Sequence, residues 1–517
     1  MSALDQSPPP FRNYHRRFLT LAALIFALLV LRRPDALTNP QFWAEDGATF
    51  FYSQSVSGSW EALFTTYAGY LHLAPRLIAA LASLFPVVFA PLIFNLCALA
   101  IASICCSMFF LPWYRHLLPS DVLRAALCLL IASAFYSDAL VGVLTSVQWY
   151  LAVAALLVLV RPATLEARWP LWVALAEGFL VFIIGLSAPQ TVVLVPFCAW
   201  KIAKSRGRAR LAPAALTGAV LIQIGIVAGQ ASQHVLHFES RPDELVAAAL
   251  ISFIYRVALC SVGGYKLPQI ISAAKMGGGA LIALLVVAVC LSWLWSHTPW
   301  SRRWRVAAGL YLIFGSIVLS LHSRSMTRMF LTLDQLPEWG GERYFYLACC
   351  VFAYLAAIGV ERVFQRQGDG AKCLALILIF AGGAIASFRV GPLANLHWGE
   401  SAAAVESWLR VTRSDIPNQG LSIPVNPSPW KIQLPGCSFG APPPWLTEQL
   451  ASKWEGQLVR PPGTLAEDVE GYVIRKGIKH RVANAAWATR HGYNWPHDVK
   501  TMCVQDLAAI PTGEDVR

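Results

Sequence analysis

Charged side chains are scarce in this sequence. Only 14% of the 517 residues are Asp, Glu, Lys or Arg, whereas 56% are hydrophobic, and the mean hydropathy is +0.52. A soluble globular domain usually carries about 25% charged residues. The composition therefore excludes an ordinary soluble protein. It predicts an integral membrane protein with room for about a dozen spans, at roughly 20 apolar residues each, plus a soluble part.

Several common site motifs are also missing. The sequence contains no CxxC, HExxH or GxxxxGK[ST] pattern, and most of its 12 cysteines lie in apolar runs, where cysteine acts as a small hydrophobe. The sequence therefore names no cofactor, and a divalent metal stays an open possibility. The net charge of +12 does not indicate nucleic acid, because the basic residues cluster between apolar runs, as in cytoplasmic loops.

The distribution of lysine and arginine predicts the topology. Basic residues place segment 1–17 in the cytoplasm. Arg32 and Arg33 follow the first apolar run in place of a small-residue cleavage site, so this run is expected to remain as a span. The other predicted spans follow at about 86–111, 123–136, 140–160, 211–228, 279–295, 306–321, 344–360 and 373–388.

Two stretches fit this pattern less simply. Only about thirty apolar residues separate Arg168 from the basic cluster that begins at Lys201, so two short spans or a re-entrant pair must fit there, turning near residues 187–190. Segment 245–268 is moderately apolar but carries Arg256 and Lys266, and we expect it to lie at the external interface. The total is about eleven spans in an all-α bundle over residues 18–389, with a cytoplasmic N-terminus.

Residues 390–517 differ in composition from the rest of the chain. They are richer in proline and polar residues, and "LSIPVNP" and "YVIRKG" are typical of short strands bounded by Pro and Gly. We expect a small α+β domain outside the cytoplasm. In that compartment a disulfide between Cys437 and Cys503 is permitted, although no spacing rule pairs the two.

An acidic pair, Glu45 and Asp46, lies in the first external loop, residues 38–85. Carboxylates beside a membrane span are either simply hydrated or placed for a function. Aromatic residues surround the pair, among them Trp43 and Tyr70, and such rings suit both sugar stacking and structural anchoring at the interface.

His72 and Arg76 follow in the same loop, four residues apart and so on one face of a helix. A guanidinium at the membrane surface can hold the phosphate of a lipid carrier, or can extend to ordinary headgroups. The sequence leaves both readings open.

These features together resemble the GT-C superfamily of membrane glycosyltransferases, which take sugars from polyprenyl-phosphate donors. The similarity lies in the first loop with its acidic pair, the bundle of about eleven spans and the external C-terminal domain. The pieces "FWAEDGATFF", "YAGYLHLAPR", "SVQWYLAV", "GLSAPQTVVLVPF", "GERYFY" and "PVNPSPW" are also similar to recurring segments of a group of bacterial membrane proteins near that superfamily.

The resemblance implies roles for particular residues. An acidic residue of the first loop, Asp46 or Glu45, would act as base toward the acceptor hydroxyl or help to bind a metal. Candidates to bind the substrates and stabilise the leaving phosphate are His72, Arg76, Lys266, Arg343 and Tyr344, with Trp43 and Tyr70 for the sugar. Asp334 and Glu338 are further acidic residues near Arg343. The Glu-Asp order differs from the Asp-Asp, Asp-Glu or Asp-x-Asp of better-known relatives, which leaves the base and the metal open.

The function expected from this resemblance is transfer of a sugar from a polyprenyl-phosphate donor to a glycan or lipid of the cell envelope, at the outer face of a bacterial inner membrane. A transporter or flippase of a lipid-linked sugar or small solute is the alternative. Transport usually needs polar residues inside several spans, and Glu177 is a rare example here. A noncatalytic scaffold is the third reading.

Overall fold

The computed structural model describes most of the chain. The described residues are 11–135, 139–230, 241–273, 277–323, 341–410, 421–434, 451–460, 471–482, 485–494, 498–502, 507 and 510–516. Asp334, Glu338, Cys437 and Cys503, which the sequence analysis singled out, lie outside these ranges. Nothing in the structure therefore tests the predicted disulfide or the two further acids.

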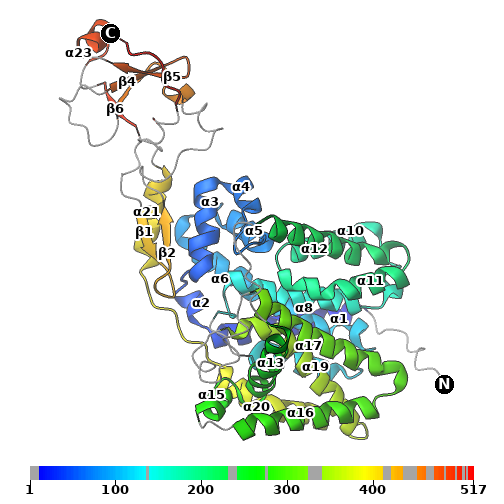
Figure 1. Ribbon diagram of the computed structural model, residues 1–517. Coiled ribbons are helices and arrows are strands. Elements are labelled where there is room, and N and C mark those ends of the chain that lie inside the picture. The colour runs from blue at the N-terminus through cyan, green and yellow to red at the C-terminus, as the bar shows by residue number, and fades with distance from the viewer. Residues whose placement is uncertain are drawn as a thin grey trace.

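Most of the described chain is helical (Figure 1). The helices of the first half are α1 (Phe11–Arg32), α2 (Asp35–Thr38), α3 (Tyr52–Ser57), α4 (Ser59–Phe64), α5 (Leu73–Ala82), α6 (Ala90–Ser107), α7 (Asp121–Ser133), α8 (Val147–Val160), α9 (Ala163–Glu166), α10 (Leu171–Gly185), α11 (Val195–Lys204) and α12 (Leu211–Gln230). Those of the second half are α13 (Pro242–Ser252), α14 (Cys260–Gly263), α15 (Lys266–Ala273), α16 (Gly277–His297), α17 (Arg303–Ser323), α19 (Tyr346–Val363), α20 (Asp369–Ser387), α21 (Trp398–Arg410) and α23 (Ala485–Arg490).

Seven helical stretches in the described chain are long and apolar enough to cross a membrane. They are 14–32, 87–110, 207–229, 242–263, 300–322, 342–363 and 369–387. Shorter apolar helices of 10–17 residues accompany them, including α8 and α10. These helices make the chain an integral membrane protein, as its composition predicts.

Arg32, the last residue of α1, joins this helix to the ends of α7 and α20. Its side chain is buried, and its guanidinium donates hydrogen bonds to four backbone carbonyls, those of Ala132, Phe135 (2.9 Å), Ser387 (3.0 Å) and Phe388 (3.1 Å). These carbonyls lie at or just beyond the C-terminal ends of α7 and α20, where a helix leaves acceptors unpaired and favours positive charge. The burial of Arg32 against these carbonyls explains how a charge is accommodated at the end of an apolar helix.

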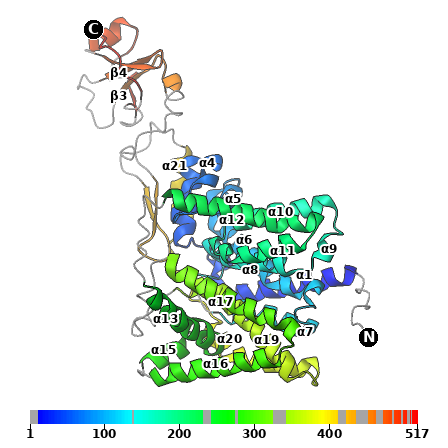
Figure 2. The same ribbon diagram turned by 45° about the vertical axis from the view of Figure 1, so that its right-hand side comes forward.

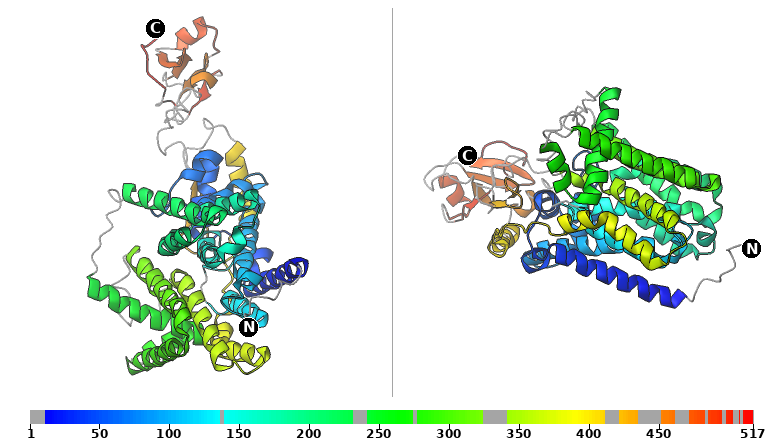
Figure 3. Two further views of the ribbon diagram at one scale, coloured as in Figure 1. Left: turned by 90° about the vertical axis from the view of Figure 1, so that its right-hand side faces the viewer. Right: turned by 90° about the horizontal axis from the view of Figure 1, so that it is seen from below.

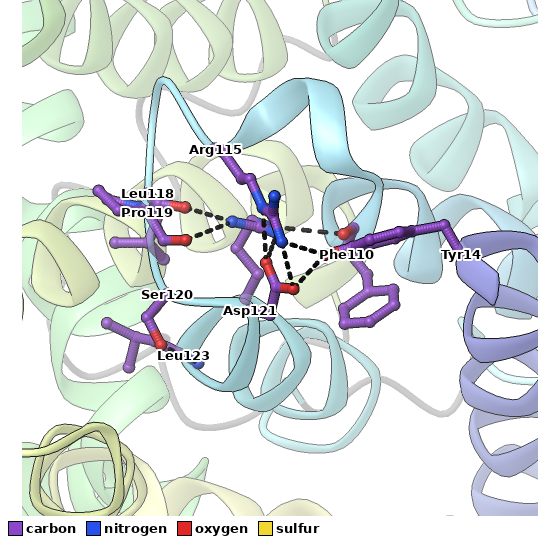
Figure 4. A network of polar contacts seen from close by, with 9 residues as sticks. Tyr14, Phe110, Arg115, Leu118, Pro119, Ser120, Asp121 and Leu123 are labelled. Carbon is purple, nitrogen blue, oxygen red and sulfur yellow. Dashed lines mark hydrogen bonds and ion pairs between the residues drawn. The ribbon is translucent and has the colours of Figure 1, made fainter. Parts of the chain in front are cut away.

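The N-terminal ends of α1 and α7 also meet, in a second polar network (Figure 4). The carboxylate of Asp121 accepts hydrogen bonds from Tyr14 of α1 and from Arg115 (2.8 and 3.0 Å), and it pairs with the buried Arg124. Arg124 also donates to the carbonyls of Leu118 (2.6 Å) and Pro119 (3.0 Å). Because Tyr14 meets α7 near its start and Arg32 meets it near its end, α1 and α7 run in the same direction.

Small residues let α10 and α12 pack closely, side by side (Figures 1 and 2). A Cβ atom at Gly185 would lie 2.5 Å from the Cβ of Ala219, so no larger residue fits there. Small residues at helix interfaces are typical of membrane bundles. After Gly185 the chain turns and continues as the 3₁₀ segment η6 (Pro189–Leu194) and α11, so the turn falls where the sequence predicts it.

A buried ion-pair cluster joins α8, α9, α10 and α11. Glu166 accepts from Arg161 (2.8 Å) and Lys201 (2.6 Å), and Arg161 also pairs with Glu177 (2.6 Å). The ammonium of Lys201 donates to the carbonyl of Val158 as well (2.8 Å). Glu177, the charged residue that the sequence analysis noted inside an apolar stretch, is therefore paired.

Segment 242–263 differs from its predicted interfacial placement. It forms one helical stretch of α13, the π-helical segment η8 (Phe253–Leu259) and α14, and it is one of the seven by length and composition. Arg256, which motivated that placement, is buried and pairs with Glu342 at 2.6 Å. Pairing explains how an apolar helix carries this charge.

The C-terminal part contains the strands of the described chain. They are β1 (Leu421–Pro424), β2 (Lys431–Leu434), β3 (Leu458–Arg460), β4 (Gly471–Arg475), β5 (Ile478–Val482) and β6 (Lys500–Thr501). Strands β1 and β2 form an antiparallel hairpin, with Ile423 opposite Ile432. The other four form a sheet in the order β5-β4-β3-β6 with its own small core, which includes Val459, Ile474 and Met502. The four-stranded sheet and the beginning of α1 lie at opposite ends of the molecule (Figure 3).

The Glu166 cluster gives a stability prediction. The variant Glu166→Gln removes a carboxylate shared by two buried cations, and breaking such a pair costs about 3–5 kcal/mol. We expect a clear fall in the Tm of the purified protein, followed by tryptophan fluorescence in detergent. The control is Asp243→Asn, because its pair with Arg241 is largely exposed (65% and 72%) and screened by water. Equal losses in both variants would contradict the assignment.

Candidate functional site

The acidic pair begins the π-helical turn η1 (Asp46–Phe51), just before α3. Asp46 is almost completely buried. Its two carboxylate oxygens accept the backbone N–H groups of Leu144 (2.8 Å) and Thr145 (2.7 Å). These amides open the short segment η5 (Leu144–Ser146), which leads into α8, and donors at a helix start need such acceptors. Asp46 therefore joins the first loop to the start of α8.

The charge state of Asp46 results from two opposed effects. Burial raises the pKa of its carboxyl to about 8, and this outweighs the two amide hydrogen bonds, which favour the ionised form and lower the pKa. Arg33 lowers the pKa further, and it lies over the ring of Trp43 at 5.7 Å. With both oxygens occupied by amides, Asp46 has a positioning role.

Glu45 faces the other way, into a small pocket. One of its carboxylate oxygens lies 3.9 Å from a guanidinium nitrogen of Arg343, and the other is buried and makes no hydrogen bond. The Arg343 side chain is 20% exposed, and its guanidinium lies 5.3 Å from the centre of the Tyr344 ring. The pocket thus holds a carboxylate with a free acceptor beside a strongly cationic group.

Aromatic and amide side chains form the rest of the pocket, whose described lining is Glu45, Tyr67, Tyr70, His72, Thr145, Ser146, Gln148, Trp149, Arg343 and Tyr344. The Tyr70 hydroxyl donates to the side-chain amide oxygen of Gln148 at 3.2 Å, and the centres of the Tyr70 and His72 rings lie 4.2 Å apart. Trp149 packs edge-on against Tyr344 at 5.2 Å. Such a mixture of rings and hydrogen-bonding groups has the chemistry to bind a sugar. The pocket volume of about 10 Å³ has room for no more than about one water molecule, so a sugar would enter only if the lining side chains moved apart.

The six sequence pieces used for the resemblance converge here. The backbone N–H groups of Leu73 and Ala74, in the second piece, donate to two groups of the fourth piece. These acceptors are the Leu186 carbonyl (3.3 Å) and the Ser187 hydroxyl (2.8 Å). The side-chain amide of Gln190, in the fourth piece, donates to the backbone carbonyl of Gln148, in the third piece, at 3.2 Å. Residues far apart in sequence therefore build one end of the bundle around the pocket.

The sixth piece, residues 424–430, packs against the loop that carries Glu45 and Asp46. The Asn426 N–H donates to the Phe42 carbonyl at 3.2 Å, and the Asn426 carbonyl accepts from Ala44. A Cβ atom at Gly47 would lie 3.0 Å from both Phe42 and Val425, so glycine lets the loop approach this closely. The hairpin β1–β2 thus helps to hold Glu45 and Asp46 in place.

The structure brings together some of the predicted site residues and separates others. Glu45, Tyr70, His72, Arg343 and Tyr344 line the pocket. Trp43, Arg76 and Lys266 are absent from its described lining. Trp43 packs near Arg33 and forms a backbone bridge with Asn426, and Lys266 is exposed at the start of α15.

Arg76 lies one helical turn beyond His72. Only 1% of its surface is exposed, its guanidinium lies 5.5 Å from the Phe50 ring, and none of its three nitrogens makes a hydrogen bond. Burial lowers its pKa to about 10. A buried cation without a partner is costly, so an anionic ligand would stabilise it.

The sequence analysis did not place Thr145, Ser146, Gln148 or Trp149 among the candidate site residues. Their one available signal was their position at the predicted outer end of a span. Within the described residues, no group of three or more His, Cys, Asp or Glu side chains is arranged to hold a metal ion.

No protein-family model, curated protein or solved structure matches this chain. The resemblance to GT-C enzymes therefore rests on the first loop with its acidic pair and on the expected bundle and C-terminal domain. The quoted pieces are similar to a group of bacterial membrane proteins near that superfamily.

The Asp46 contacts give a second stability prediction. In Asp46→Asn the side chain keeps one acceptor oxygen and loses the other, which leaves one buried N–H of η5 unpaired at a cost of about 1–3 kcal/mol. We expect a lower Tm for the purified protein. The control Glu61→Gln changes an exposed carboxylate of the same loop and should melt like wild type. An unchanged Tm in Asp46→Asn would show that these hydrogen bonds contribute little.

Proposed function

We propose that this protein is a membrane glycosyltransferase of GT-C type, which passes a sugar from a polyprenyl-phosphate donor to a glycan or lipid acceptor of the cell envelope. The observation that carries the proposal is the pocket that holds the Glu45 carboxylate among tyrosine, tryptophan and amide side chains. One of its oxygens lies 3.9 Å from Arg343, and the other makes no hydrogen bond. A base, a cation and sugar-stacking rings are the groups that this reaction needs.

The proposed topology has eleven spans, formed by α1, α6, α7, α8, α10, η6 with α11, α12, α16, α17, α19 and α20. The basic residues Arg115, Arg168, Arg206, Arg302 and Arg366 then lie in the cytoplasmic connections. The N-terminus is cytoplasmic, whereas the pocket and the C-terminal region lie outside, at the outer face of a bacterial inner membrane. Segment 242–263 is long and apolar enough to cross as well, but a crossing there would place Arg302 and Arg366 outside. The proposal therefore counts this segment as embedded in the bundle without crossing.

In the proposed reaction Glu45 is the base. The acceptor hydroxyl gives its proton to the free oxygen of Glu45 while its own oxygen bonds to the anomeric carbon of the sugar. The bond between that carbon and the phosphate oxygen breaks, and the electron pair leaves with the polyprenyl phosphate. Arg343 stabilises the negative charge that develops on the phosphate.

Other residues support these steps. Asp46 holds the loop that carries Glu45 and takes no proton from the substrate. His72, Tyr70, Tyr344 and Trp149 contact the sugar or its phosphate, and Arg76 provides a second cation for an anionic group nearby. The C-terminal domain would bind the acceptor, and its proximity to the loop through Asn426 supports this role.

Transport remains the alternative class, and the described ion pairs give it little support. Glu177 is engaged by Arg161, and Arg256 is engaged by Glu342, so neither offers a free charge along a pathway. A carrier would need polar groups that exchange partners near the middle of the membrane.

The first test compares envelope glycans by mass spectrometry in cells that lack the protein and in cells complemented at matched membrane levels. Wild type should restore a sugar that Glu45→Gln leaves missing, because loss of a general base slows the reaction by about 10²–10⁴-fold. Arg343→Gln should behave like Glu45→Gln. The control Glu61→Gln, in the same external loop, should restore the sugar.

The outcomes separate the proposals. Full restoration by Glu45→Gln would overturn the role of Glu45 as base. A glycan profile that does not depend on the protein at all would overturn the transferase assignment. If Asp46→Asn restores the sugar when its membrane level matches that of wild type, the role of Asp46 is in stability rather than in proton transfer.

A further inference from the structure

A second cavity lies within the bundle, away from the Glu45 pocket. It has a volume of about 100 Å³, is partly open, and is lined from α6, α7, α8, α11, α17 and α19. Nearly all of its surface is apolar, from side chains such as Phe109, Leu127, Val153, Leu312 and Val351. This space exceeds that of a single water molecule and lacks the polar partners that ordered water needs.

One charged residue, Arg305, belongs to the described lining, together with Tyr354. The Arg305 Nε atom and the Tyr354 hydroxyl are both buried and make no hydrogen bond. The two groups lie close enough to act on each other electrostatically. An apolar cavity therefore carries two unsatisfied polar groups, and buried groups of this kind normally have a partner.

The charge around Arg305 has one sign. Arg302 and Arg362 act on it electrostatically, and Arg305 in turn acts on His116. Within the described chain no carboxylate lies within ion-pair distance of Arg305. An anion at this place would therefore meet several positive groups.

We propose that this cavity binds one anionic phospholipid, with part of an acyl chain in the space among α7, α8, α17 and α19 and its phosphate on Arg305 and Tyr354. The apolar lining matches a hydrocarbon chain, and charge complementarity selects an anionic headgroup. A free phosphate would leave the apolar space unused, and a neutral lipid would gain less from the basic cluster. The proposal is independent of the transferase assignment.

Occupancy of this cavity would also bear on the Glu45 pocket, because both share two helices. Trp149 lies near the start of α8, and Val153 and Val160 farther along this helix line the cavity. Tyr344 lies two residues before α19, which carries Leu347 and Tyr354. A lipid between these helices would stabilise the packing on which the pocket depends.

The test is native mass spectrometry of the full-length protein in detergent, titrated with phosphatidylglycerol. We expect one tightly bound molecule, weakened about tenfold or more in Arg305→Gln through loss of a charge-assisted contact. Ala308→Phe, which fills the cavity, should weaken binding as well. Arg303→Gln, a neighbouring arginine outside the described lining that lies over Trp300, is the matched control and should bind like wild type.

Two competitors identify what the site recognises. Phosphatidylcholine should bind more weakly than phosphatidylglycerol, and glycerol 3-phosphate should not displace the lipid. Equal binding by Arg305→Gln and Arg303→Gln, equal binding of both lipids, or displacement by glycerol 3-phosphate would each overturn the proposal. The wild-type competition decides the question even where a variant fails to fold.

Discussion

The hydrogen bonds of Asp46 to the amides of Leu144 and Thr145 are the constraint on which the candidate site depends. They join a loop near the N-terminus to the start of α8, and both of these segments carry pocket residues. Because each oxygen accepts one amide, the loop is fixed in position and in rotation. Glu45, next in sequence, is thereby turned toward Arg343, and the two neighbouring acids acquire different environments.

The same physical requirement recurs elsewhere in the bundle. Helix ends within a membrane protein must find partners for their unpaired carbonyls. Arg32 satisfies the ends of α7 and α20, and Lys201 satisfies the end of α8. Arg124 does the same for the carbonyls of residues 118 and 119 in the connection before α7. Basic residues here act as much on backbone carbonyls as on carboxylates, which accounts for several of the excess positive charges.

Sequence reasoning predicted the helical bundle, the short turn near residues 187–190 and the strand-containing C-terminal part, because these follow from hydrophobic runs and local breakers. It also selected five residues that line the pocket. It could not separate Glu45 from Asp46, since the difference arises from amides about 100 residues away. It also selected Arg76, Trp43 and Lys266, which are absent from the described pocket lining. Proximity in sequence or a position at a span end does not give the direction of a side chain.

The sequence by itself determined that this chain enters a membrane, where its polar segments fall and which residues have the chemistry of a site. Composition and periodicity report the local preference of each segment for lipid or water, so they suffice for that. Only the tertiary structure decided which acid is free, which arginines are paired and that six distant pieces meet at one pocket. Those outcomes depend on contacts between segments, which the order of residues along one segment does not encode.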